Sequence, residues 1–140
     1  PGVGLYLRHN GGFLDQTEPP GQGYVAFVQA FGLGTGIGIW REIDGVETIL
    51  APFTPQAIAT GVVHAVRFRV VQEGPATTRV QTRVWPLEGM EPADWHVDLT
   101  DASPSLQGVG GGLVIDVWSQ LEVGVAADVF VDDIVVGPAS

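Results

Sequence analysis

Three carboxylates, Glu42, Asp44 and Glu47, fall within six residues of the chain, in the stretch EIDGVE. A retaining glycoside hydrolase uses a pair of carboxylates about 5 to 5.5 Å apart, one as nucleophile and one as acid. The same stretch also places Asp44-Gly45 between two apolar, β-branched arms, which is a strong signal for a two-residue hairpin turn. The residues therefore allow either a catalytic strand or a turn.

The hairpin interpretation predicts a definite pairing of residues on either side of the turn. It places Ile43 opposite Val46, Glu42 opposite Glu47, Arg41 opposite Thr48, Trp40 opposite Ile49 and Ile39 opposite Leu50. A glycine in the middle of a strand would weaken the catalytic alternative. A solvated turn would also not raise a carboxyl pKa by burial, as acid catalysis requires. We therefore expect a turn and a non-catalytic protein.

Alternating apolar residues mark most of the chain as β-strand, and helical periodicity is hard to find. The 20 glycines and 10 prolines punctuate these segments in the way that turns do. The pattern predicts a single all-β domain over residues 1–140, folded as a two-layer antiparallel β-sandwich of about nine strands. The expected strands are Val3–Arg8, Tyr24–Phe31, Ile37–Ile43, Val46–Leu50, Val62–Gln72, Thr78–Trp85, Trp95–Leu99, Leu113–Trp118 and Val129–Val136.

The charge of the chain limits its partners. Sixteen acidic residues against six arginines and no lysine give a net charge of −10, which would repel nucleic acid. No apolar run approaches the roughly 20 residues that span a bilayer, so membrane insertion is not expected. The chain has no cysteine, which excludes disulfides and thiolate metal sites. Neutral glycans, cations and other proteins remain as partners. Four arginines alternate on neighbouring expected strands and should be solvated and salt-bridged: Arg67, Arg69, Arg79 and Arg83.

Aromatic side chains are candidates for a carbohydrate site, because exposed rings pack against the C–H faces of sugars. The candidates are Tyr24, Trp40, Trp85 and Trp95. Trp40 lies on the hairpin face opposite the aliphatic row and is the best candidate for exposure. For Trp85 and Trp95, which lie near prolines, mutual packing is the favoured alternative.

Aspartates in the second half of the chain are candidates for a structural calcium site, since Ca²⁺ takes six to eight oxygen ligands. The candidates are Asp101, Asp132 and Asp133. Asp132 and Asp133 are adjacent on an expected strand and would point to opposite faces, so at most one of them can serve a given site. No D-x-D-x-D-G loop accompanies them, and solvated charge is the favoured alternative.

The order of motifs along the chain resembles the concanavalin A-like, or laminin-G-like, jelly-roll modules of secreted actinobacterial proteins and of phage minor tail or fibre proteins. The matching stretches are GLYLRH, GIGIWR, VRFRV, RVWP followed by EPADW, and VDDIVV. The resemblance implies a jelly roll, and such modules often carry a structural Ca²⁺. A further strand region precedes the matching part in those modules. We therefore expect a processed chain or a fragment that lacks an N-terminal strand region.

Three functions follow as expectations. The preferred one is a non-catalytic carbohydrate or cell-surface recognition module, extracellular or on a virion, that presents one sheet face and loop 9–23 to a surface glycan. The second is a structural assembly module that packs against other subunits or forms a homo-oligomer through an unpaired sheet edge. The third is a glycoside hydrolase using Glu42 and Glu47, because E-x-D-x-x-E also resembles the laminarinase signature, which has an apolar residue where Gly45 stands.

Overall fold

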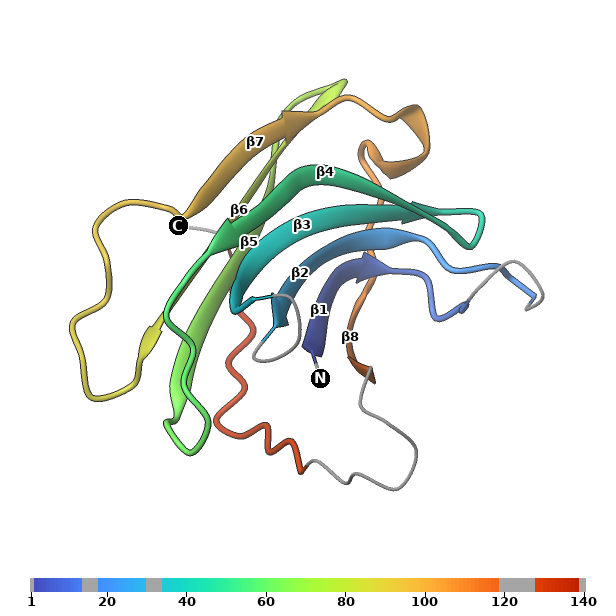
Figure 1. Ribbon diagram of the computed structural model, residues 1–140. Coiled ribbons are helices and arrows are strands. Elements are labelled where there is room, and N and C mark those ends of the chain that lie inside the picture. The colour runs from blue at the N-terminus through green and yellow to red at the C-terminus, as the bar shows by residue number, and fades with distance from the viewer. Residues whose placement is uncertain (1, 14–17, 30–33, 119–127, 139–140) are drawn as a thin grey trace.

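The protein is a sandwich of two antiparallel sheets (Figure 1), seen in a computed structural model that describes residues 2–13, 18–29, 34–118 and 128–138. The five-stranded sheet has the order β4-β3-β2-β1-β8, and the three-stranded sheet has the order β5-β6-β7. The strands are β1 (Gly2–His9), β2 (Gly23–Gln29), β3 (Gly36–Ile43), β4 (Val46–Pro55), β5 (His64–Gly74), β6 (Thr77–Pro86), β7 (Val97–Asp101) and β8 (Gly112–Trp118), with a short 3-10 helix η1 (Pro104–Leu106) between β7 and β8.

The all-β, two-layer prediction is confirmed, and eight of the expected strands are present. The ninth, Val129–Val136, is wrong, because residues 128–138 lie outside both sheets. β-Branched residues suit a segment to a pleated sheet, but a strand also needs a neighbour that takes its backbone hydrogen bonds. The end of the expected Tyr24–Phe31 strand, at residues 30–31, lies outside the described residues.

The hairpin prediction is confirmed at the turn and for the first four predicted residue pairs, and it fails at the fifth. Asp44 and Gly45 have φ angles of 53° and 74°, the positive values that a type I′ turn requires. Pairing follows the predicted register from Ile43–Val46 out to Trp40–Ile49. Beyond that point Ile39 lies opposite Ala51, not Leu50, because a β-bulge adds one residue to β4. Sequence alternation does not reveal such an insertion.

The hydrophobic core lies between the two sheets and follows the period of two expected for strands. The five-stranded sheet supplies Tyr24, Ile37 and Ile39, all fully buried. The facing residues of the three-stranded sheet are Val80, Val84 and Val97. Strand β6 lies against β3 and β7 against β4. The five-stranded sheet arches, and the three-stranded sheet lies on its convex side (Figure 1).

Candidate binding face

The concave, outer side of the five-stranded sheet carries one aromatic ring from each of its strands. The rings belong to Tyr6, Phe27, Trp40, Phe53 and Trp118, and we call this surface the aromatic face. Phe27 stacks on Trp40 with ring centroids 4.7 Å apart and lies nearly parallel to Phe53 at 6.5 Å. Trp40 in turn contacts Trp118 at 5.5 Å. The rings therefore form a continuous apolar surface.

Glycines in the strands provide the space in which these rings lie. A Cβ added at Gly38 would overlap the ring of Phe27, and one added at Gly2 would overlap the indole of Trp118. At Gly4, a Cβ would lie 3.2 Å from the Tyr6 ring and 3.5 Å from that of Trp118. A glycine within a strand often marks such a close approach. The rings therefore lie against the backbone instead of standing up from it.

The contact between Trp40 and Trp118 spans most of the sheet. Trp40 is on β3 and Trp118 is on β8, with β2 and β1 between them. Since neighbouring strands are about 4.8 Å apart, the two backbones are separated by roughly 14 Å. A centroid distance of 5.5 Å is reached because both indoles extend along the surface of the sheet. The two rings thus cover the glycine-bearing strand β1.

Carboxylates border the aromatic face on the same side of the sheet. The register places Glu47 directly opposite Glu42, and it places Asp116 opposite Gly4. Partial burial, with the nearby charge of Asp116, raises the pKa of Glu47. Burial and the charges of Glu47 and Glu42 likewise raise the pKa of the Tyr6 hydroxyl. The register therefore places the acidic groups on the same side of the sheet as the rings.

Glu42 is buried, with 1% of its surface exposed, so the expectation of a solvated carboxylate at this position is wrong. The loop that joins β1 to β2 covers it: a Cβ added at Gly21 would overlap the Glu42 carboxylate. His9 lies on its other side, with Nε2 at 3.9 Å from Oε2 of Glu42. His9 Nδ1 accepts a hydrogen bond from Gly11, which leaves the proton of the neutral ring on Nε2, facing the carboxylate. Burial lowers the pKa of His9 and favours this neutral form.

The same loop is attached to the tip of the hairpin. The N–H of Gly45 donates to the carbonyl of Gly21 at 2.8 Å. Asn10 holds the two ends of the loop together, since its side chain donates to Pro20 and accepts from the N–H groups of Gly12 and Gln22. The loop and the turn therefore form one wall at the end of the aromatic face.

Access to the aromatic face differs from ring to ring. Tyr6 and Phe27 are buried, at 2% and 7% exposure, so they support the surface from below. Trp40, Phe53 and Trp118 are partly exposed. Ile49, opposite Trp40 on β4, is 68% exposed and extends the apolar surface to the edge of the sheet. A ligand on this face would therefore meet the two indoles and their aliphatic and acidic surroundings.

Tyr24 is not available as a ring for a ligand, because it is fully buried in the core. Its hydroxyl donates a 2.8 Å hydrogen bond to Oδ2 of Asp101. Burial and the contact with Asp101 raise the pKa of Tyr24 to about 12. Sequence alternation could not separate this inner position from the outer one, since β2 is apolar on both faces.

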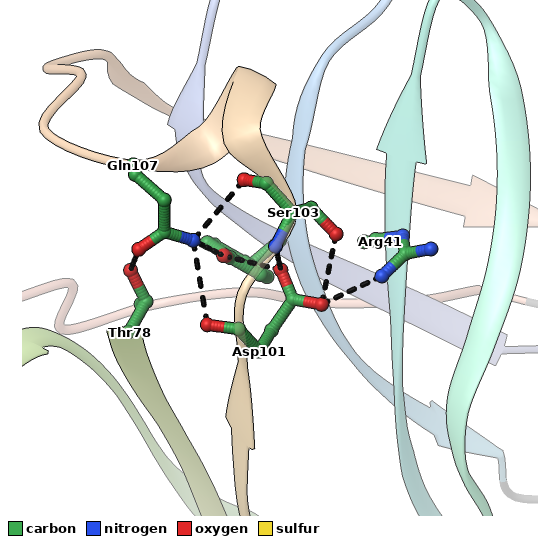
Figure 2. Close-up of polar contacts among 6 residues, drawn as sticks. Arg41, Thr78, Asp101, Ser103 and Gln107 are labelled. Carbon is green, nitrogen blue, oxygen red and sulfur yellow. Dashed lines mark hydrogen bonds and ion pairs between the residues drawn. The ribbon is translucent and has the colours of Figure 1, made fainter. Parts of the chain in front are cut away.

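Asp101 is likewise a structural residue and not an open ligand for calcium. Arg41 donates to it at 2.6 Å, and the N–H and hydroxyl of Ser103 donate at 3.1 and 2.9 Å (Figure 2). Burial alone would raise the pKa of Asp101, but the hydrogen bonds from Tyr24, Ser103 and Arg41 hold it below its usual value. Gln107 completes the cluster by contacting Thr78 and the carbonyls of Asp101 and Ser103. The carboxylate is thus fully engaged in joining the sheets.

Asp132 and Asp133 lie in the exposed segment 128–138, outside both sheets, and not on the strand that was expected for them. No group of three or more histidine, aspartate or glutamate side chains that could hold a metal ion occurs within residues 2–13, 18–29, 34–118 and 128–138. The arrangement of the described residues therefore gives no support to the calcium hypothesis.

Trp85 and Trp95 belong to the opposite surface of the molecule. Trp85 follows Val84 on β6 and projects away from the core. The guanidinium of Arg83 lies 4.4 Å from the ring centroid of Trp95. Both tryptophans are partly exposed, and the structure describes no ring contact between them, so their expected mutual packing is not seen. Of the four candidate aromatic residues, only Trp40 lies on the aromatic face.

The arginines of the three-stranded sheet are paired largely as expected. Arg79 contacts Asp98 at 2.7 Å and Glu73 at 3.4 Å, while Arg67 and Arg83 both contact Glu91. This surface is therefore electrically balanced, in contrast to the acidic border of the aromatic face.

Sequence reasoning missed three parts of the aromatic face: Phe27, Phe53, and the glycines Gly2 and Gly4 against which Trp118 lies. A signal for them exists in the alternating glycines of GVGLY and GIGIW, where every second residue of a strand lacks a side chain on one face. Such spacing indicates a surface on which other side chains lie flat.

Comparisons with protein-family models, with curated proteins and with solved structures found no match. Among the described residues, no helix is long and apolar enough to cross a membrane.

Proposed function

We propose that this protein is a non-catalytic carbohydrate-recognition module of an extracellular or virion surface and that the aromatic face binds the glycan. The observation that carries the proposal is the row of rings seated on glycines, with the partly exposed Trp40 and Trp118 in contact. Sugars present flat patches of C–H groups, which pack well against aromatic rings. The concanavalin A-like resemblance of the sequence agrees with this use of the outer sheet face.

The polar border of the face supports the same function. Sugar hydroxyls need hydrogen-bond acceptors beside an apolar platform, and Glu47 and Asp116 are placed to supply them. A net charge of −10 disfavours an anionic ligand. A neutral glycan therefore fits the surface better than a sulfated or highly carboxylated one.

The test is a glycan array followed by titration of the best ligand against matched tryptophan variants. Trp118→Ala and Trp40→Ala each remove a ring from the aromatic face, whereas Trp95→Ala removes a partly exposed ring from the opposite surface. An aromatic stacking contact contributes about 0.5 to 1.5 kcal/mol, so each of the first two changes should weaken binding by about two- to twelvefold. Trp95→Ala should leave the affinity unchanged. Equal losses for all three, or no ligand on the array, would contradict the proposal.

A glycoside hydrolase is the second candidate, because Glu42 and Glu47 lie directly opposite each other and the pKa of Glu47 is raised. Against it, the loop at Gly21 covers Glu42 and leaves 1% of its surface exposed, so a substrate cannot reach it. We therefore expect binding without turnover. Release of reducing sugar from the bound glycan, abolished by Glu47→Gln and unaffected by Asp44→Asn, would favour the hydrolase instead.

An assembly module is the third candidate, and exposed apolar residues on the two edge strands of the larger sheet favour it. Val46 and Ile49 on β4 are 60% and 68% exposed, and Val117 on β8 is 49% exposed. Light scattering distinguishes this function: a discrete oligomer that Ile49→Lys dissociates, together with an empty glycan array, would identify an assembly domain.

A further inference from the structure

The inner face of the five-stranded sheet is only partly covered by the second sheet. Strands β6 and β7 lie over β3 and β4, and the core cluster ends at the side chains of β2. Val3 and Leu5 on β1 share the inner face with β2, as do Ile115 and Val117 on β8. None of these four belongs to the core or packs against it, and Val117 is 49% exposed. An apolar strip that is only partly covered therefore lies on β1 and β8, and the end of β1 contacts β5 where Arg8 donates to Gln72.

Strand β5 forms the border of this strip and has an open edge. Within the described residues it pairs with β6 alone, so its other edge presents backbone N–H and C=O groups without a strand partner. Its inner residues Val66, Phe68 and Val70 pack against the core but remain partly exposed. A further strand at this edge would pair with β5 and cover the apolar strip below it.

The chain contains a segment suited to that position. Residues 129–136 (VFVDDIVV) are apolar and β-branched apart from two aspartates, yet they lie outside both sheets, as the orange-red segment of Figure 1 shows. Phe130, Val135 and Val136 are 90%, 92% and 67% exposed. Exposure of so many large apolar side chains in one short segment is costly in water, at about 25 cal/mol for each Å².

Charge complementarity also favours this pairing. On the outer side of β5, Arg69 donates to the side-chain oxygen of Gln81 at 3.3 Å and contributes to lowering the pKa of Asp98, while its buried Nε has no hydrogen-bond partner among the described residues. The neighbouring arginines of the sheet all have carboxylates. Asp132 and Asp133 are adjacent, and since neighbouring strand residues alternate between faces, one of them would face the outer side with Arg69.

We propose that residues 129–136 of the same chain dock as an additional strand on the open edge of β5 and cover the apolar strip of β1 and β8. The nine residues between Trp118 and Asp128 could span about 30 Å when extended, whereas stacked sheets are roughly 10 Å apart. Arg69 then gains a second acidic neighbour beside Asp98.

Amide hydrogen exchange of the full chain, with its mass measured by light scattering at the same concentrations, tests this proposal. We expect a monomer in which the amides of residues 129–136 and the edge-facing amides of β5 exchange roughly tenfold or more slowly than an unfolded chain. Ile134→Pro removes a donor within the segment and should abolish this protection at both places. Gly137→Pro, just beyond the segment, should preserve it, and slow exchange in β2 and β3 shows that each variant is folded.

Three results would overturn the proposal. Unprotected amides at residues 129–136 in the unmodified chain would mean that the segment does not dock. Protection that survives Ile134→Pro would exclude strand pairing there. Protection that appears only together with the mass of a dimer would assign the β5 edge to the segment of a second copy.

Discussion

The glycine at position 38 offers the sharpest test of how the aromatic face is built. Adding one methyl group in Gly38→Ala places a Cβ where the ring of Phe27 now lies. The ring cannot sink into the sheet, because the backbone of β3 is beneath it. It must rise, and in rising it leaves its stacked position between Trp40 and Phe53.

The expected cost follows from those contacts. Each aromatic pair contributes about 0.5 to 1.5 kcal/mol beyond its buried area, so loss of two pairs amounts to about 1 to 3 kcal/mol. Overpacking by a methylene group costs about the same in well-packed interiors. With a slope of about 2 kcal/mol per molar urea, the unfolding midpoint should fall by about 0.5 to 1.5 M. Trp40 fluorescence should change in the folded state, since its neighbour moves.

Gly74→Ala is the matched control, because it makes the same substitution at a strand glycine where an added Cβ meets nothing within 4 Å. It should be neutral or slightly stabilising, as the unfolded chain loses freedom. If Gly38→Ala unfolds at the same urea concentration as Gly74→Ala, then the absence of a Cβ at Gly38 is not what allows the ring of Phe27 to lie against the backbone. The explanation of the aromatic face by its strand glycines would then be wrong.

Three further predictions concern the interior and the turn. Tyr24→Phe removes the hydroxyl that donates a hydrogen bond to Asp101. The free energy of unfolding, measured by urea titration, should fall by about 1 to 3 kcal/mol. The pKa of Asp101 is lower in the folded protein than in the unfolded chain. The ionised carboxylate should therefore contribute fully to the free energy of unfolding above about pH 4, and this contribution should be lost as the pH falls towards the folded pKa. Asp101→Asn should remove this pH dependence from unfolding free energies measured between about pH 2 and 7. Gly45→Ala forces a side chain into a φ of 74° and should cost about 1 kcal/mol by thermal unfolding, whereas an unchanged midpoint would argue against the type I′ turn.

Local chemistry made much of the fold predictable. Asp44-Gly45 determines the turn, and the period of two assigns Ile37 and Ile39 to the core without reference to distant residues. The failed ninth strand at 129–136 shows the limit of that reasoning, since the same β-branched composition describes a segment that the structure leaves outside both sheets. Composition gives a segment the capacity to pair, but the segment's own residues do not determine whether it pairs or with which edge.

The site was less predictable, because burial there depends on contacts between remote segments. Glu42 looked exposed beside a turn, yet a loop some twenty residues earlier in the chain covers it at Gly21. Tyr24 looked like a surface ring, yet its hydroxyl finds Asp101 at a separation of 77 residues. Trp40 was placed correctly because hairpin register alone decides which side it takes.

The contact of Trp40 with Trp118 has a consequence for what the aromatic face can select. The two indoles act as a cross-brace between β3 and β8, strands that share no backbone hydrogen bonds, and flattening the arch of the sheet would pull them apart. The curvature of the aromatic face is therefore fixed by the same side chains that would contact the proposed ligand. If the aromatic face binds a glycan as proposed, a surface held in this curved form would fit single, rounded chains better than the planar surface of a crystalline polymer.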